Sequence, residues 1–345
     1  MKKSSVYYLL SLTLCTATLA TAAPSVLFPV VVGGRWGYAD KNGQIVINPQ
    51  FEREDVFAQG LAPVRMGRWG FVDTSGKYII NPQFDNAFPF SEGLAGVKIG
   101  GGGGVDVPYD PRPWSPFHDG VIGGGGRYGF INADGKVVIN PQFDDEHSFA
   151  GGFASVKMGR WGFIDKSGKV VINPQFDDAG SFSEGLAWVK MGGHFGYVDS
   201  TGNFVINPQF ERAQPFSDGL AAVRSSGKWG FVDKSGKFVI NPQFDDAGSF
   251  VKGLAPVRQK HWGFISHEGT FTVNPQFDNA LSFSEGVAPV RQSGHWGYMD
   301  TTGKFTINPQ FDDAQCFTNG LARVKTGGRW GYVDASGKYV YNPTN

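Results

Sequence analysis

Short stretches of alternating apolar and polar residues recur along the chain, each bounded by turn-forming residues. In one copy they cover residues 220–224, 228–233 and 237–241. All three are rich in β-branched or aromatic side chains and are bounded by Gly, Ser, Asn or Pro, which is typical of short strands. The pattern predicts an all-β unit of three strands, a β-meander.

Side chains two residues apart in a strand share a face. Trp229 and Phe231 are therefore expected on one face of the second strand, and Phe238 and Ile240 on one face of the third. A free ribbon cannot keep so many large apolar groups in water, so neighbouring units must pack on one another. We expect the tryptophans to be core residues rather than a carbohydrate platform. The glycine after each of them should let a neighbour approach closely.

The unit repeats every 33 or 34 residues. Steps such as RWGYAD, RWGFVD, KWGFVD and HWGYMD, each followed by a turn glycine and an INPQF-type segment, resemble the WG-repeat family. Tyr128 and Phe195 replace the tryptophan in two of the nine copies. The resemblance covers residues 27–345 apart from one insertion. It implies a repeat array but no particular reaction, because the family is defined by its repeat.

The phase of the repeat predicts how the array is built. The modules begin near residues 27, 61, 94, 153, 186, 220, 254, 287 and 321. The array opens on a first strand and closes on a third strand, whereas a ring closed by strand exchange splits one module between both ends. We therefore expect nine three-stranded meanders in an open, solenoid-like superhelix. A ring closed by face contact alone is the alternative.

The N-terminus has the features of a secretion signal. Lys2 and Lys3 precede an apolar stretch at residues 6–19, and Ala20-Thr21-Ala22 is an A-x-A-type cleavage site. The stretch is too short and too rich in threonine to span a membrane. The sequence predicts a signal peptide at 1–22, cleavage before Ala23 and a single array at 23–345. The protein is expected to be an exported bacterial-type protein, periplasmic or extracellular.

Composition removes several classes of function. Lysine and arginine total 31 and aspartate and glutamate total 31, so no net basic charge favours nucleic acid. Beyond the signal one cysteine remains, Cys316, which excludes an intrachain disulfide. Other copies carry serine at its position, so we interpret it as a small loop residue and not a reactive thiol.

Repetition also argues against catalysis, which needs singular residues held together. His194, His261 and His295 stand where other copies carry Arg or Lys, so they are surface substitutes and not metal ligands. Turn geometry explains the recurrent aspartates, since Asp at the first position of such a turn bonds its own backbone. These are Asp40, Asp73, Asp165, Asp199, Asp233, Asp300 and Asp334. The pairs Asp177-Asp178, Asp245-Asp246 and Asp312-Asp313 lack the ligand series of calcium loops. We expect no catalytic residue, no metal site, no cofactor and no enzymatic activity.

Basic residues form two rows. One ends the first strands: Arg65, Lys98, Lys157, Lys190, Arg224, Arg258, Arg291 and Lys325. The other precedes the aromatic-Gly step: Arg35, Arg68, Arg127, Arg160, Lys228 and Arg329. Ion pairing with aspartates is the simpler interpretation of both rows. A cationic groove for an anionic glycan is the alternative.

One segment, residues 100–126, breaks the period with about 26 extra residues that are rich in Gly and Pro. Loops carry function more often than their scaffolds do. Its candidate binding residues are Tyr109, Arg112, Trp114, Phe117 and His118. A passive expansion is the alternative, because glycine runs tolerate insertion at little cost.

These patterns favour an exported binding or scaffolding protein of the cell envelope, whose partner is a protein or an envelope glycan. A glycan-binding protein that uses the aromatic and basic rows is one alternative. A hydrolase that uses Asp110, His118 and Asp119 in the 100–126 insertion is the other.

Overall fold

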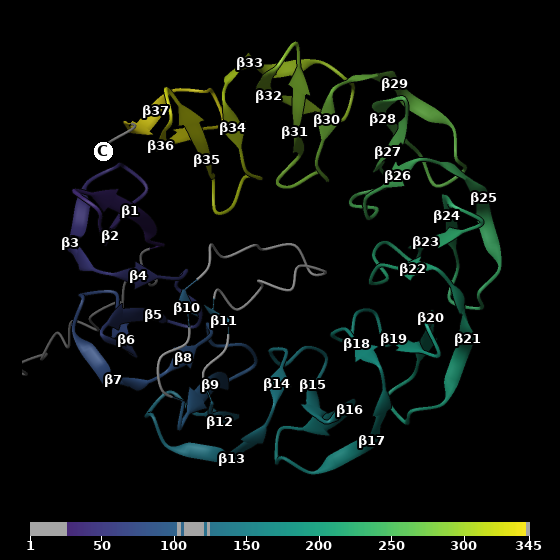
Figure 1. Ribbon diagram of the computed structural model, residues 1–345. Coiled ribbons are helices and arrows are strands. Elements are labelled where there is room, and N and C mark those ends of the chain that lie inside the picture. The colour runs from purple at the N-terminus through teal and green to yellow at the C-terminus, as the bar shows by residue number, and fades with distance from the viewer. Residues whose placement is uncertain (1–25, 102–104, 107–120, 123–124, 343–345) are drawn as a thin grey trace, which may run out of the picture.

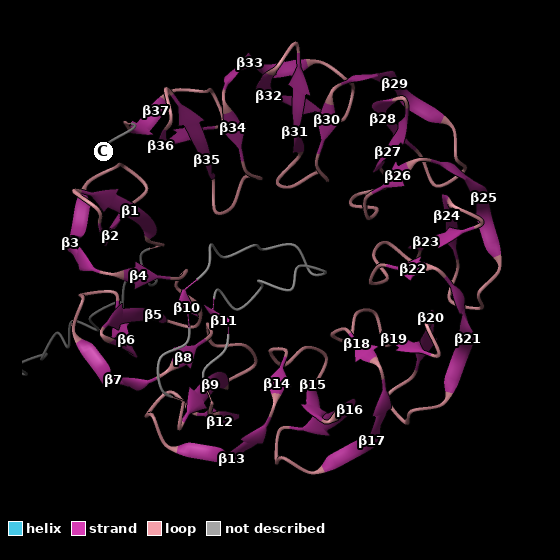
Figure 2. Cartoon of the chain, in the orientation of Figure 1, coloured by secondary structure: helices cyan, strands magenta, loops and turns pink. Residues whose placement is uncertain are grey.

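The computed structural model describes residues 26–101, 105–106, 121–122 and 125–342. The described residues form strands, turns and loops (Figure 2). Nine sheets stand around a common axis and close into a ring, a nine-bladed β-propeller (Figure 1). The described part of the chain holds no helix that is long and apolar enough to cross a membrane.

Blades are numbered here along the chain. Blade 1 is β1–β3, blade 2 is β4–β7, blade 3 is β8, β9, β12 and β13, and each later set of four strands is one blade up to blade 9, β34–β37. Within a blade the strands follow one another antiparallel from the inside of the ring to its rim (Figure 1).

The innermost strands are two residues long: β4 (Arg53–Glu54), β8 (Asn86–Ala87), β14 (Asp145–Glu146), β18 (Asp178–Ala179), β22 (Arg212–Ala213), β26 (Asp246–Ala247), β30 (Asn279–Ala280) and β34 (Asp313–Ala314). The next strands outward are β1 (Phe28–Val32), β5 (Leu61–Met66), β9 (Ala95–Ile99), β15 (Phe153–Met158), β19 (Ala187–Met191), β23 (Ala221–Ser225), β27 (Ala255–Gln259), β31 (Val287–Gln292) and β35 (Leu321–Thr326).

The strands with the aromatic-Gly step come third: β2 (Arg35–Ala39), β6 (Arg68–Asp73), β12 (Arg127–Ile131), β16 (Arg160–Asp165), β20 (His194–Val198), β24 (Lys228–Val232), β28 (His261–Ile265), β32 (His295–Asp300) and β36 (Arg329–Asp334). The rim strands are β3 (Ile45–Phe51), β7 (Tyr78–Phe84), β13 (Val137–Phe143), β17 (Val170–Phe176), β21 (Phe204–Phe210), β25 (Phe238–Phe244), β29 (Phe271–Phe277), β33 (Phe305–Phe311) and β37 (Tyr339–Tyr341).

The prediction of three-stranded units is wrong for eight of the nine blades. The linker after each Asn-Pro-Gln-Phe segment supplies a fourth strand on the inner edge of the next blade. In blade 5, for example, Asp178 pairs with Lys190 and Ala179 with Val189. Two residues are too few to show an alternating pattern, so the linker does not look like a strand in the sequence. Blade 1 has three strands among the described residues.

A bulge in eight of the nine rim strands explains the glycine that follows the tryptophan, or Tyr128 and Phe195 in its place. Trp229 pairs with Phe244 and Phe231 with Ile240, so four steps on β25 face two on β24. A Cβ on Gly230 would lie 2.6 Å from the Ile240 carbonyl oxygen, so only glycine fits beside the bulge. The expected close approach at this glycine is confirmed, and it is an approach of backbone within the blade.

The same irregular register overturns one assignment of faces. Phe238 packs into the core between blades 5 and 6, whereas Ile240 packs into the core between blades 6 and 7. The two side chains were expected on one face because they are two residues apart. The register shift between Phe231 and Val232 breaks that alternation.

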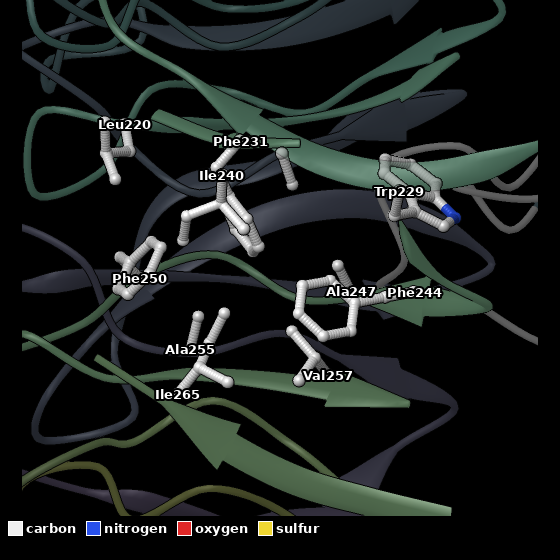
Figure 3. Packing of buried hydrophobic residues seen from close by; sticks show 11 residues of the cluster. Leu220, Trp229, Phe231, Ile240, Phe244, Ala247, Phe250, Ala255, Val257 and Ile265 are labelled. Carbon is white, nitrogen blue, oxygen red and sulfur yellow. The ribbon is translucent and has the colours of Figure 1, made fainter. Parts of the chain in front are cut away.

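The cores lie between blades rather than inside them. Figure 3 shows one, in which Trp229, Phe231 and Ile240 of blade 6 meet Phe250 and Val257 of blade 7. The Phe231 and Phe250 rings pack edge to face with their centroids 4.8 Å apart. Every blade thus needs a neighbour on each side to cover its two apolar faces.

Blade 9 and blade 1 cover each other's apolar faces. The prediction of an open superhelix is therefore wrong, and the ring closes by face contact. Phe28 and Val30 of blade 1 share a buried cluster with Leu321 and Tyr332 of blade 9. The Phe28 and Tyr332 ring centroids are 5.5 Å apart, and the Tyr332 hydroxyl donates to the Pro29 carbonyl over 2.9 Å. A constant rotation at each junction returns the chain to its start after nine blades, which no local sequence pattern reveals.

Candidate functional site

The 100–126 insertion joins β9 to β12 in blade 3. The described residues next to these two strands form its base, called the root below. Gly101 N–H donates to Asp85 Oδ2 over 2.7 Å. Ordinary turns use the same bond, as Gly159 does with Asp144 over 2.8 Å. Above the root, β10 (Val105–Asp106) pairs with β11 (Val121–Ile122). The insertion therefore begins as a regular blade turn that continues into a second short hairpin.

The five predicted binding residues, Tyr109, Arg112, Trp114, Phe117 and His118, lie outside the described residues, and so do Asp110 and Asp119. Their prediction as a binding or hydrolytic site is untested. In the view down the ring axis, β10 and β11 are drawn on the inner side of blade 3 (Figure 1).

The insertion shares its edge of the ring with both basic rows, because all of them lie where the second strand of a blade turns into the third. In the row that ends the first predicted strands, Lys98, Lys190, Arg258 and Lys325 lie over the aromatic ring of their own blade. Lys98 Nζ lies 5.2 Å from the Tyr128 ring centroid, and Lys190 Nζ lies 5.5 Å from that of Phe195. These contacts are cation–π interactions, which hold the ammonium groups over rings of the same blade.

Five of the six residues of the second basic row pair with the acidic residue that follows an Asn-Pro-Gln-Phe segment. Arg160 Nη1 lies 3.3 Å from Asp177 Oδ1, and Lys228 Nζ lies 2.5 Å from Asp245 Oδ1. Arg127 pairs with Asp144 in the same way. Such exposed pairs add little stability each. They do satisfy much of the positive charge locally, which favours ion pairing over a cationic groove.

Most of the tryptophans are core residues, as predicted. Trp69, Trp161, Trp229 and Trp296 are buried, with 6–8% of their surface exposed. Trp36, Trp262 and Trp330 are half-buried. A row of rings that is largely covered gives a sugar little face to stack on.

The recurrent turn aspartates are used by their own turns, as predicted. Asp233 Oδ1 accepts hydrogen bonds from Ser235 N–H, Ser235 Oγ and Lys237 N–H at 2.6–3.1 Å. The bond from Ser235 Oγ is the main cause that lowers the pKa of Asp233. These carboxylates stay charged and engaged in the turn.

The neighbouring aspartates point to different partners. Asp177 Oδ2 accepts from Gly192 N–H over 2.9 Å, while Asp178 Oδ1 accepts from Ala179 N–H over 3.0 Å. Within the described ranges no three His, Cys, Asp or Glu side chains gather as a metal site would require.

Cys316 sits partly buried in an inner loop, and its thiol lies 3.7 Å from the Ser282 carbonyl oxygen. Burial raises the pKa of the thiol, which keeps it protonated and poorly reactive. Two histidines are structural: His147 stacks on Trp161 with centroids 4.8 Å apart, and His267 stacks on Phe250 at 4.4 Å.

A buried acidic residue near the insertion went unnoticed in the sequence. Glu146 of β14 is 1% exposed, and neither carboxylate oxygen has a hydrogen-bond partner among the described residues. It lies against Gly96 of β9 in the preceding blade. Burial, and then the charge of Asp145, raise the pKa of Glu146 to about 8. The available signal was that six other innermost strands carry alanine at this position.

A second polar cluster lies where blade 1 meets blade 9. The guanidinium of Arg323 lies between two rings, 5.3 Å from the Trp36 centroid and 4.7 Å from the Trp330 centroid. Glu54 of β4 is near enough for Arg323 to stabilise its charged form. Burial and the charge of Asp55 outweigh this and raise the pKa of Glu54 to about 8.

Comparison with known proteins gives a family match and a fold match. The WG containing repeat family matches residues 36–68, 69–102, 128–160, 161–193, 195–229, 229–260, 262–294 and 296–330. No curated protein matches the chain.

Among solved structures, a crystal structure of a eukaryotic initiation factor is similar with a TM-score of 0.62 and 10% identity, covering 91% of this chain and 95% of that one. The dihydro-heme d1 dehydrogenase NirN in complex with DHE has a TM-score of 0.47 and 13% identity, covering 94% and 74%. The extracellular domain of a putative hybrid two component system from B. thetaiotaomicron has a TM-score of 0.36 and 11% identity, covering 93% and 52%. At these identities the initiation factor supports the propeller fold alone, and the other two carry no argument.

Proposed function

The chain belongs to the WG-repeat family and is a repeat β-propeller, and from this premise we propose that it is an exported binding protein of the cell envelope. The 100–126 insertion holds its ligand, and the ring is the scaffold that presents the insertion. The partner is a protein or an envelope glycan.

The observation that carries the proposal is the contrast between the insertion and the other turns at the same edge. Elsewhere the connection from the second to the third strand of a blade is a tight turn of one or two residues, for example one residue between β15 and β16. Among the described residues, only the connection from β9 to β12 extends into a further hairpin, β10–β11, and its base keeps the regular bond of Gly101 to Asp85. The blade does not need the extension for its own pairing.

The packing and pairing of the repeated side chains also favour the insertion as the binding site. Most of the tryptophans are packed in cores, and many basic residues are paired with carboxylates or aromatic side chains of the propeller. The insertion instead offers Trp114 and Phe117, which have no repeat counterpart. Aromatic side chains of this kind supply much of the binding energy at interfaces.

Export is part of the proposal and rests on the N-terminal signal pattern. Residues 1–25 lie outside the described residues. Intact mass of the protein secreted or released from the periplasm tests it, because cleavage before Ala23 removes residues 1–22. A mature protein that retains them, or that carries a lipid on Cys15, contradicts this part.

The test of binding uses the mature protein and two variants. In the short variant residues 100–126 become a single glycine, so that Ile99 and this glycine copy Met158-Gly159. The new glycine can then donate to Asp85 as Gly159 does to Asp144. In the matched control, residues 102–124 become a Gly/Ser segment of equal length. Each protein is immobilised and exposed separately to envelope proteins and to purified envelope glycan from the host cell.

Both variants are expected to melt close to the wild type, because closing a loop of about 26 residues costs only a few RT. Both should lose the ligand that the wild type retains, and Trp114→Ala should lose much of it. Retention of one glycan but no protein identifies the glycan-binding alternative at the insertion. A ligand held equally by all of these proteins places binding on the ring and overturns the proposal.

A further inference from the structure

Neighbouring blades are joined at their inner loops by a repeated hydrogen bond. Eight of the loops between the first and second strands of a blade have one residue with a left-handed backbone two positions before the first predicted strand. In five of them its side chain accepts from a glycine N–H of the next blade: Gln59, Glu92, Glu184, Asp218 and Glu285. Glu92 Oε2 accepts from Gly152 N–H over 3.0 Å, and Glu184 accepts from Gly219 N–H over 3.2 Å. The loop carboxylate is thus a regular contact between blades.

At two of these junctions a lysine from the next blade joins the carboxylate. Lys166 Nζ lies 3.0 Å from Glu92 Oε2, and Lys234 Nζ lies 3.2 Å from Glu184 Oε2. Both lysines occupy the second position of the Asp-Lys-Ser-Gly turn between the third and rim strands. At both junctions the lysine in this turn position therefore pairs with a carboxylate from the preceding blade.

The junction of blade 9 with blade 1 keeps the lysine and lacks the carboxylate. Lys41 has the turn position of Lys166 and Lys234, while Asn319 has the loop position of Glu92 and Glu184. Within the part of the chain that the structure describes, Lys41 has no ion pair. An amide cannot neutralise the ammonium group as a carboxylate does.

A cleft of about 440 Å³ lies at this place, which is within the size range of small-molecule sites. Its lining includes Lys41 and Asn42 of blade 1 with Asn319, Lys338 and Tyr339 of blade 9. The other side chains of the lining bring apolar surface from Leu321 and Val340 and one carboxylate, Asp334.

Asp334 does not serve as the missing carboxylate. Its Oδ1 accepts hydrogen bonds from Ser336 N–H, Ser336 Oγ and Lys338 N–H at 2.6–3.1 Å, as in the other turns. The cleft thus presents two ammonium groups and two amides around a carboxylate that its own turn already engages.

We propose that this cleft binds a small carboxylate ligand, a sugar acid or an acidic amino acid. The ligand carboxylate takes the place that Glu92 and Glu184 fill at their junctions and pairs with Lys41 and Lys338. The amides of Asn42 and Asn319 bond the hydroxyl or amide groups of the ligand, and Leu321 and Tyr339 cover its apolar side. This site is at the opposite edge of the ring from the insertion and does not depend on the proposed function.

The test is titration of the full mature protein by calorimetry with two acids and their neutral counterparts. Glucuronate is compared with glucose, and N-acetylglutamate with N-acetylglutamine. One acid is expected to bind at least about tenfold more tightly than its neutral counterpart, because a charge-assisted bond of about 1.5–3 kcal/mol is lost without the carboxylate. The acid that binds identifies which class of ligand fits.

Asn319→Glu is the decisive variant, because it supplies the carboxylate from within the chain. The backbone suits it: φ is 54° at Asn319 and 51° at both Glu92 and Glu184. The N–H of residue 319 remains held by Glu285 Oε1 over 2.6 Å. The variant should fold with an unchanged or higher melting temperature, and it should bind the acid at least about tenfold more weakly.

Lys41→Gln should weaken binding to a similar degree, while the matched control Lys166→Gln, at a junction already filled by Glu92, should bind as the wild type does. The proposal is overturned if neither acid binds better than its neutral counterpart. It is also overturned if Asn319→Glu, with its fold intact by circular dichroism and melting, binds the acid as tightly as the wild type.

Discussion

Residue 146 shows how two positions in adjacent blades are matched to each other. In blades 6 and 7 the corresponding pair is Ala222 with Ala247, two small side chains. Between blades 3 and 4 the pair is Gly96 with Glu146, and a Cβ on Gly96 would overlap the Glu146 carboxyl. Close-packed interiors tolerate such exchanges only when volume is conserved across the contact.

Gly96→Ala is therefore expected to destabilise the wild type by about 1–3 kcal/mol, the usual cost of overpacking. The same change should be nearly neutral or stabilising by about 0.4–1 kcal/mol in a Glu146→Ala background, where the obstacle is gone. Denaturant melts of the two single variants and the double variant give the coupling energy. Equal costs in both backgrounds would show that the two residues do not compete for the same space.

The buried carboxyl also predicts a pH dependence. In the folded protein the pKa of Glu146 is about 8, raised from an ordinary 4.5, mainly by burial. The folded state therefore binds a proton that the unfolded state releases between these values. The contribution of the Glu146 carboxyl to stability is complete below about pH 4.5 and is lost as the pH rises through about 8.

Glu146→Gln should flatten the fall in melting temperature between pH 5 and pH 8, because glutamine has no proton to release. Glu54, whose pKa is also raised to about 8, keeps part of the slope in the variant. A melting temperature that falls equally with pH in both proteins would mean that Glu146 is ionised in the folded state.

At the scale of strands, the sequence predicts the elements it repeats at length and misses those built from two residues. The strands after Leu220, at the Trp-Gly step and before Asn-Pro were all expected, since each shows alternation over about five residues. Asp246–Ala247 is a strand only because it pairs with β27, a non-local contact that local pattern does not report. The bulge in β25 likewise shifts Ile240 off the face that a strict period of two assigns.

Of the two candidate sites, one can be predicted from the sequence and the other cannot. The insertion is visible from sequence because it breaks the period. The cleft at Lys41 and Asn319 is not, since residues 278 positions apart meet only when the ring closes. Once the ring is known, comparison of Asn319 with Glu92 needs nothing beyond the repeat.

The tryptophan strand offers a direct comparison of a middle and a terminal blade. Trp229 packs with Ala247 and Val257 of the next blade, whereas Trp330 faces blade 1, which has no described innermost strand. Trp229→Ala should cost about 3–5 kcal/mol, as for other large core truncations. Trp330→Ala should cost less, because Trp330 is half-buried from the outset.

Denaturant unfolding of both variants measures the difference. If the Trp229→Ala variant is as stable as the wild type and loses glycan binding, the result favours the aromatic-platform interpretation instead.

At the scale of the whole molecule, closure depends on one junction without a covalent or strand-exchange link. Phe28 fills this junction at a position where all eight other blades carry alanine, for example Ala62. It is 7% exposed and packs on Tyr332. The larger side chain suits a blade that lacks a described innermost strand.

Phe28→Ala restores the repeat consensus, and yet it is expected to destabilise the protein by about 3–5 kcal/mol. Hydrogen exchange should rise in blade 9 as well as in blade 1, because both lose cover when the ring opens. Faster exchange confined to blade 1 would mean that Tyr332 and its neighbours do not rely on this contact.

The bond that roots the insertion has a consequence for protein engineering. The bond of Gly101 to Asp85 is repeated at Gly67, Gly159, Gly192, Gly227, Gly294 and Gly328 with the acidic residue of each blade. A foreign peptide grafted after any of these glycines would leave on the same side of the molecule. Several copies grafted together would form a circular multivalent display, whose avidity would depend on how well the spacing of the blades matches that of the target.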